Sequence, residues 1–190
     1  QARISPRPTL LVAMGGSDPF GLTLIAARAL AKLDPVFRAR FVIGPGVKDG
    51  VAVARAVVAL SPNFETLEGA DDLATEYAAA DIALAAFGVT AYELAAYGVP
   101  ALYLCLNEDH ALSASAFEDA GIGLSLGLAD HAQASDISGS VWALLTDSAR
   151  RRDMRAAGLM TVDGEGAALV ASDLSQELTG TRLTPKRAAV

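Results

Sequence analysis

Apolar runs typical of strands alternate along this chain with longer runs typical of helices, and this alternation limits the fold more than any other feature. The strand-like runs cover residues 9–14, 39–44, 64–68, 81–86, 101–106 and a glycine-containing 121–127. Helix-like runs follow them at residues 22–33, 50–60, 72–80, 90–98, 109–120, 133–146, 148–157 and 165–178. Strands that are apolar throughout, each followed by a helix, are typical of a parallel sheet covered on both faces. We therefore expect an α/β/α sandwich with about six parallel strands in the order 3-2-1-4-5-6.

The composition is that of one folded domain. Of the 190 residues, 52% are hydrophobic and only 19% are charged, which provides a sizeable core and argues against disorder. We expect the domain at residues 9–178, between a basic, proline-containing linker at 1–8 and a polar tail at 179–190. The formal net charge of −7 argues against nucleic acid and anionic membranes as partners.

Cys105 is the only cysteine of the chain. A single cysteine excludes an internal disulfide and fits a reducing cytosol, so we expect a cytoplasmic protein with Cys105 as a small core residue. The most apolar stretch, residues 82–106, contains Gly88, Glu93 and Pro100. It therefore predicts strand, turn, helix and strand, and no membrane insertion.

Ligands of an open parallel sheet bind beyond the carboxyl ends of its strands, and the first loop expected there is 14–21. Gly15 and Gly16 allow a ligand to approach the backbone closely. Ser17 or Asp18 can cap the next helix, whose first amides could then bind a phosphate. The loop matches neither the Walker motif nor the dinucleotide motif G-x-G-x-x-G. An ordinary strand-to-helix turn remains the alternative.

The second loop, residues 87–93, carries the one acid of its apolar stretch. Gly88 ends a strand, and Thr90 can cap the following helix, whose first-turn amides favour an anion. Glu93 either closes a capping box with Thr90, three residues earlier, or accepts hydrogen bonds from a vicinal diol such as ribose hydroxyls. Both interpretations stay open on the sequence alone.

The third loop, residues 106–112, is polar and follows an apolar strand. Its polar residues are Asn107, Glu108, Asp109 and His110. They could bind sugar hydroxyls, and His110 could act as an acid or base; a polar helix start capped by Asp109 is the alternative. The two isolated histidines and the single cysteine give no metal-ligand spacing, and no nucleophile motif occurs, so no metal or cofactor is expected.

Three motifs together resemble the C-terminal, nucleotide-binding half of GT-B glycosyltransferase-like proteins. The motifs are Gly15-Gly16-Ser17-Asp18-Pro19, Gly88-x-Thr90-x-x-Glu93-Leu94 and Gly98-x-Pro100. Within that group the chain is most similar to the UDP-sugar hydrolase of pseudaminic acid biosynthesis and related polysaccharide-biosynthesis proteins, and next to the lipid II N-acetylglucosaminyltransferase. The resemblance covers about residues 9–127 and implies a Rossmann-like sandwich of the GT-B C-terminal-domain type.

The resemblance also implies a role for each residue of a UDP-sugar site. Gly16 and Ser17 would line the diphosphate, and Glu93 would bind the ribose. Further phosphate contacts would come from Gly88, Val89 and Thr90. Uracil would meet the backbone of Gly69 and Ala70. Asp109 and His110 stand where the hydrolase-like proteins carry Asn-Gln facing the sugar, so the identity of the sugar stays open.

In that hydrolase the catalytic histidine belongs to the N-terminal half, which nothing in this chain matches. We therefore expect a UDP-sugar-binding domain whose full-length protein includes such a half, and we assign no catalytic residue. The activity would be that of a UDP-sugar hydrolase or a glycosyltransferase in surface polysaccharide or nonulosonic acid biosynthesis. A non-catalytic nucleotide-sugar-binding module is the alternative.

Overall fold

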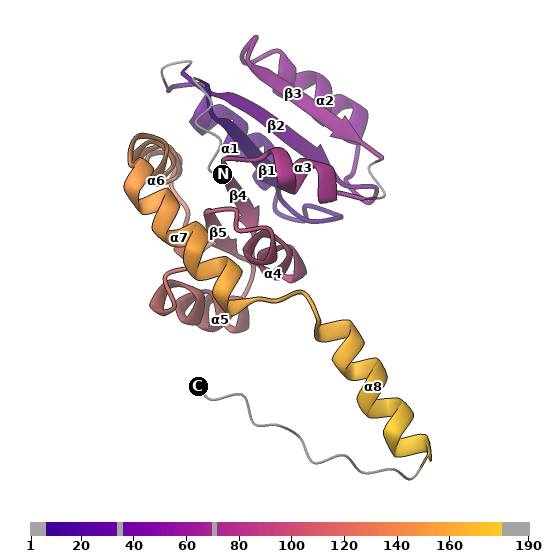
Figure 1. The fold of residues 1–190 in the computed structure, drawn as a ribbon. Coiled ribbons are helices and arrows are strands. Elements are labelled where there is room, and N and C mark those ends of the chain that lie inside the picture. Colours follow the sequence, from indigo (N-terminus) through magenta and orange to yellow (C-terminus); the bar gives the residue numbers. More distant parts are fainter. Residues whose placement is uncertain (1–6, 34–35, 70–71, 180–190) are drawn as a thin grey trace.

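The computed structural model describes residues 7–33, 36–69 and 72–179, in which helices cover both faces of one sheet (Figure 1). The strands are β1 (Thr9–Ala13), β2 (Arg38–Ile43), β3 (Phe64–Glu68), β4 (Ile82–Ala86), β5 (Ala101–Cys105) and β6 (Gly123–Leu128). The helices are α1 (Leu22–Leu30), α2 (Gly50–Val58), α3 (Ala74–Ala79), α4 (Val89–Ala96), α5 (Glu108–Asp119), α6 (Ala134–Thr146), α7 (Ser148–Thr161) and α8 (Gly166–Thr179). Most of the predicted linker and tail lies outside the described residues.

The six strands are parallel and lie in the order β3-β2-β1-β4-β5-β6, which confirms the predicted architecture and order. Alternate residues of a strand point to opposite faces of the sheet. Accordingly, Leu10 and Val12 of β1 pack into one core and Leu11 and Ala13 into the other. The central strands β4 and β5 are buried at every position, which explains their uninterrupted apolar sequence.

The helices divide between the two faces. Helices α1, α2 and α6 pack on one core, and α3, α4 and α5 pack on the other. Helix α7 contacts α4, where a Cβ added at Gly158 would lie only 2.9 Å from the Ala95 carbonyl oxygen. Helix α8 extends away from the sheet, and its large apolar side chains are exposed (Figure 1). None of the helices in the described ranges has the length and apolar character needed to cross a membrane.

The strand order creates a switch point between β1 and β4. From β1 the chain builds outward through β2 and β3, then returns to add β4 on the other side of β1. The helices that leave β1 and β4 consequently pack on opposite faces of the sheet. Their starting loops lie at the carboxyl edge of the sheet, which is where open α/β sheets bind ligands.

Candidate functional site

The loop after β1 presents exposed backbone at this edge of the sheet. Gly15 and Gly16 are exposed, and a Cβ added to either would meet no other atom within 4 Å. Gly15 has a φ of +83°, a conformation that favours glycine. The structure therefore leaves free space in front of this glycine pair and the exposed Ser17 beside it.

Asp18 is the residue that caps α1. Its buried carboxylate accepts hydrogen bonds from the amides of Leu22 at 2.7 Å and Thr23 at 2.9 Å. The expected cap is therefore confirmed at Asp18, not at Ser17. The expectation that the first amides of α1 stay free for a phosphate is wrong, because Asp18 already occupies two of them. The segment Gly15–Ser17 is the part of this loop that stays open to a ligand.

A second glycine-containing loop, absent from the sequence-based site, supports the first. Gly46 donates a backbone hydrogen bond of 2.8 Å to the Gly16 carbonyl oxygen. At Gly44, an added Cβ would lie 2.4 Å from that same oxygen and 2.7 Å from the Gly15 oxygen. The Gly44-Pro45-Gly46 turn directly follows β2. Its two glycines thus fix the position of the loop after β1. The predicted adjacency of the first two strands placed this turn near the first loop, but it did not give the strand register that brings the two into contact.

Helix α4 begins at Val89, and no described side chain caps it. Gly88 is the N-cap, and its carbonyl accepts the Ala91 amide at 2.9 Å. Thr90 is consequently the second residue of the helix and Glu93 the fifth, so the capping-box interpretation of these two residues is wrong. An uncapped helix start leaves amides without an intrahelical partner, and these favour an anion. The Cβ position at Gly88 is also open, with nothing within 4 Å.

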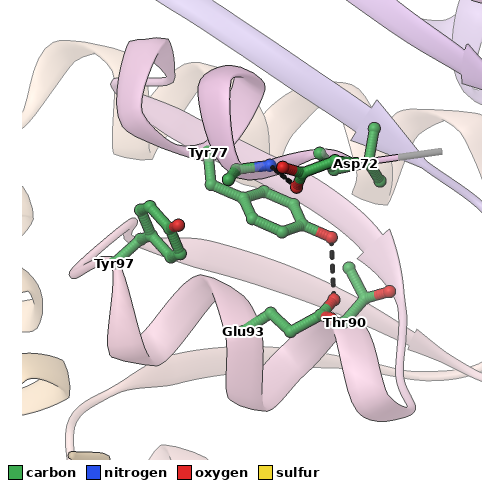
Figure 2. A pocket seen from close by; sticks show the side chains of 7 residues that line it. Asp72, Tyr77, Thr90, Glu93 and Tyr97 are labelled. Atoms are coloured by element: carbon green, nitrogen blue, oxygen red, sulfur yellow. Dashed lines mark hydrogen bonds between the residues drawn. The ribbon is translucent and has the colours of Figure 1, made fainter. Parts of the chain in front are cut away.

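Glu93 contacts a tyrosine that the sequence did not indicate. The Tyr77 hydroxyl, from α3, donates a hydrogen bond of 2.8 Å to Oε2 of Glu93 (Figure 2). Tyr77 is only 4% exposed, and its ring packs against Tyr97 with centroids 5.6 Å apart. Burial, and then the neighbouring Glu93 carboxylate, raise the pKa of Tyr77 well above its usual value. The hydroxyl is therefore a protonated donor at neutral pH.

These two side chains open onto a cavity of about 320 Å³ between α3 and α4. It is lined by Asp72, Leu73, Ala74, Tyr77, Thr90, Glu93 and Tyr97. In Figure 2, Glu93 and Tyr77 point toward each other, with Thr90 beside Glu93 and Asp72 near the Tyr77 ring. Asp72 accepts the Ala74 amide at 2.8 Å. Among the described residues that line it, the cavity thus combines two carboxylates with several hydroxyl groups and no cationic side chain.

Helix α5, which follows the loop after β5, is capped by Asn107, whose side-chain oxygen accepts the His110 amide at 2.8 Å. The alternative in which Asp109 caps is therefore wrong, and Asp109 is exposed in the first turn of α5. The His110 ring lies 6.0 Å from the ring of Phe87, between centroids. Its Nδ1 is buried and has no hydrogen-bond partner within the part of the chain that the structure describes.

The structure brings most of the predicted site residues to one edge. Ala13 of β1 pairs with Ala85 of β4, and Ala86 of β4 pairs with Leu104 of β5, so the loops that follow these strands are neighbours. Gly69 directly follows β3, an edge strand that β2 separates from β1. It is exposed and has a φ of +65°. Ala70 lies outside the described residues. Across the ranges that the structure covers, no three His, Cys, Asp or Glu residues group as metal ligands would.

No family model matches this chain. It is 31% identical over 162 residues to the spore coat polysaccharide biosynthesis protein SpsG of Bacillus subtilis strain 168, an alignment that covers 83% of this chain and 47% of SpsG. It is also 31% identical over 167 residues to the UDP-N-acetylglucosamine--N-acetylmuramyl-(pentapeptide) pyrophosphoryl-undecaprenol N-acetylglucosamine transferase of Cutibacterium acnes. That alignment covers 84% of this chain and 42% of the transferase. The chain thus spans less than half the length of either relative.

Solved structures match the fold closely. MurG of Acinetobacter baumannii superposes with a TM-score of 0.76 and 19% identity, over 92% of this chain and 51% of MurG. A co-structure of S. aureus MnaA with UDP gives a TM-score of 0.75 and 14% identity, over 97% of this chain and 50% of MnaA. The fold is that of one Rossmann-like GT-B domain. The structural matches establish architecture, and the names of the two sequence relatives refer to polysaccharide biosynthesis and to glycosyl transfer.

Proposed function

We propose that this chain is the UDP-sugar-binding domain of a GT-B-type glycosyltransferase or UDP-sugar hydrolase of surface polysaccharide or nonulosonic acid biosynthesis. The observation that carries the proposal is the uncapped start of α4, which lies at the switch point beside the open Gly15–Ser17 loop and one turn before Glu93. Backbone amides that favour an anion, next to a carboxylate, match the diphosphate and the ribose of a nucleoside diphosphate. The relatives named for polysaccharide biosynthesis and for a UDP-N-acetylglucosamine transferase support the same class.

The charges of the site indicate how the ligand lies. Asp72 and Glu93 repel phosphate, so the cavity between α3 and α4 suits the uncharged ribose, whose hydroxyls can donate to a carboxylate. The diphosphate then meets the backbone of Gly16, the adjacent Ser17 and the first turn of α4 at Gly88–Thr90. Uracil extends toward Gly69 and Ala70, beyond the end of β3.

The sugar extends from the diphosphate in the opposite direction, toward α5. There the exposed Asp109 carboxylate can accept hydrogen bonds from sugar hydroxyls. His110, beside the loop at the end of β4, can donate or accept through the ring nitrogen other than its buried Nδ1. These are sugar-binding roles, and we propose that the groups that activate water or an acceptor hydroxyl come from a further half of a longer protein.

The chemistry assigned to this domain is stabilisation of the leaving group. Water or an acceptor hydroxyl attacks the anomeric carbon, the bond from that carbon to the diphosphate breaks, and UDP leaves with additional negative charge. Backbone amides and the dipole of α4 stabilise this charge without needing to reorganise. Neutralisation by amides requires no metal ion.

The test is a titration of the chain with UDP, dTDP, GDP and CMP and their sugars, followed by calorimetry and thermal unfolding. We expect selective binding of UDP, which at ten times its Kd adds about 1.4 kcal/mol to the free energy of unfolding. A folded chain whose unfolding temperature does not change in millimolar UDP would contradict the proposal.

Gly16→Ala tests the position of the diphosphate in the same titration. The added methyl group meets nothing within 4 Å and Gly16 has no left-handed φ, so the folded state should remain as stable as the wild type. The methyl group occupies the proposed diphosphate space, and UDP affinity should fall by about tenfold or more. Gly139→Ala, at an open exposed position in α6, is the matched control: it should gain about 1 kcal/mol of stability and keep its UDP affinity. Unchanged affinity in Gly16→Ala would place the diphosphate elsewhere.

A further inference from the structure

We propose that Tyr77 is a positioning residue that orients the Glu93 carboxylate and thereby makes the site selective for a ligand with a 2′,3′-diol. The inference rests on the proposed function and adds to it a residue that sets selectivity. Its starting point is the hydrogen bond of 2.8 Å from the Tyr77 hydroxyl to Oε2 of Glu93 (Figure 2).

Glu93 needs such a partner because it lies on an exposed part of α4. A glutamate side chain in solvent loses considerable rotamer freedom when a ligand immobilises it. With Tyr77 donating to Oε2, the carboxylate is already oriented before a ligand arrives. Oε1 and the remaining lone pair of Oε2 can then accept from two adjacent hydroxyls. Pre-orientation of this kind increases affinity by reducing the cost of ordering.

Tyr77 is itself rigid, which a positioning residue must be. Its ring is buried and packs against Tyr97. The short helix α3 that carries it is attached to the sheet by an ion pair between Glu76 and Arg40 of β2. Asp72 also accepts the Ala74 amide at the start of this helix. The hydroxyl of Tyr77 therefore has a fixed position relative to α4.

Tyr77→Phe is the test, since it removes the hydroxyl and retains the buried ring. UDP and 2′,3′-dideoxy-UDP are titrated into the wild type, Tyr77→Phe, Glu93→Ala and the double variant. We expect Tyr77→Phe to weaken UDP binding by about three- to tenfold and to leave dideoxy-UDP binding unchanged. Without the carboxylate the hydroxyl has nothing to orient, so the double variant should bind UDP as Glu93→Ala does.

Tyr103→Phe is the matched control. It also removes a buried phenol hydroxyl that contacts α4, at 3.4 Å from the Ala91 carbonyl oxygen, but Tyr103 does not line the cavity. Its UDP affinity should equal that of the wild type. If Tyr77→Phe weakens UDP and dideoxy-UDP equally, or weakens neither, the role of Tyr77 is overturned while UDP binding by the wild type still supports the proposed function. If the folded wild type binds no UDP, the proposed function itself fails.

Discussion

Glu93 is the fifth residue of α4, too far along the helix to close a capping box, and its partner is a tyrosine hydroxyl. Glu93→Gln should therefore cost little folding stability, because the amide oxygen still accepts the Tyr77 hydrogen bond. The substitution removes a charged acceptor from the ribose, so UDP affinity should fall by about ten- to a hundredfold, equivalent to about 1.5–3 kcal/mol. Isothermal titration calorimetry measures the difference.

The control for this prediction is again a ligand without the diol. 2′,3′-Dideoxy-UDP should bind the wild type and Glu93→Gln almost equally well. Equal affinity of the two proteins for UDP itself would mean that the carboxylate binds no ribose hydroxyl.

Single residues also mark the limit of what the sequence could predict at this site. Asp18 was predictable as a cap because aspartate is favoured before helices, although it lies four residues before Leu22, the first residue of α1. Thr90 and Glu93 matched a capping pattern equally well, but the helix starts at Val89 because of the backbone conformation at Gly88. Tyr77 was missed because it reaches Glu93 from another helix, and no local pattern encodes such a contact.

At the scale of elements, the turn after β2 determines where the loop after β1 lies. In Gly44→Ala the new Cβ would lie 2.4 Å from the Gly16 carbonyl oxygen, a backbone atom that cannot rotate away. The loop must shift, so we expect a loss of about 1–3 kcal/mol of stability and weaker UDP binding. Urea denaturation and calorimetry measure the two effects separately.

Gly46→Ala provides the graded comparison for this turn. Its Cβ would lie 3.1 Å from the same oxygen, which a shift of a few tenths of an ångström relieves. Its losses of stability and UDP affinity should accordingly be smaller than those of Gly44→Ala. If both variants behave like the wild type, the turn does not determine the position of the loop.

The order of the helices and strands was predictable from the sequence, but the residues at which they begin and end were not. Apolar runs such as that of β4 remain recognisable because both faces of the strand are buried, and parallel crossovers allow few arrangements. Helix starts depend on one or two backbone torsions, so α1 begins only at Leu22, after the left-handed N-cap Gly21. Approach of two loops, as at Gly16 and Gly44, depends on the register of β1 and β2, which the apolar pattern does not specify.

For the molecule as a whole, the cavity between α3 and α4 belongs to the same core as two buried tyrosines. Burial raises the pKa of both Tyr77 and Tyr103 above the usual value near 10, and the Glu93 contact adds to the effect at Tyr77. This arrangement links binding and stability, because the phenol that orients Glu93 is also a packed core residue. The sequence indicated the strand that contains Tyr103 but not which face of the sheet would contain a ligand cavity.

The raised pKa values predict how the stability of the whole domain depends on pH. Above about pH 10, tyrosines of the unfolded chain lose protons while the buried phenols of the folded state retain theirs. The unfolded state then binds fewer protons, so the free energy of unfolding falls as the pH rises. The contribution is complete below about pH 10 and is lost above it, at up to about 1.4 kcal/mol per pH unit for each tyrosine.

Urea denaturation of the wild type and Tyr103→Phe between about pH 9 and about pH 11 measures this effect, since other titrating groups cancel in the comparison. Tyr103 is the cleaner residue to replace, because burial alone raises its pKa. We expect the wild type to lose more stability than Tyr103→Phe over this range. Parallel curves for the two proteins would show that Tyr103 ionises equally easily in the folded and unfolded states, which would contradict its complete burial between β4, β6 and α4.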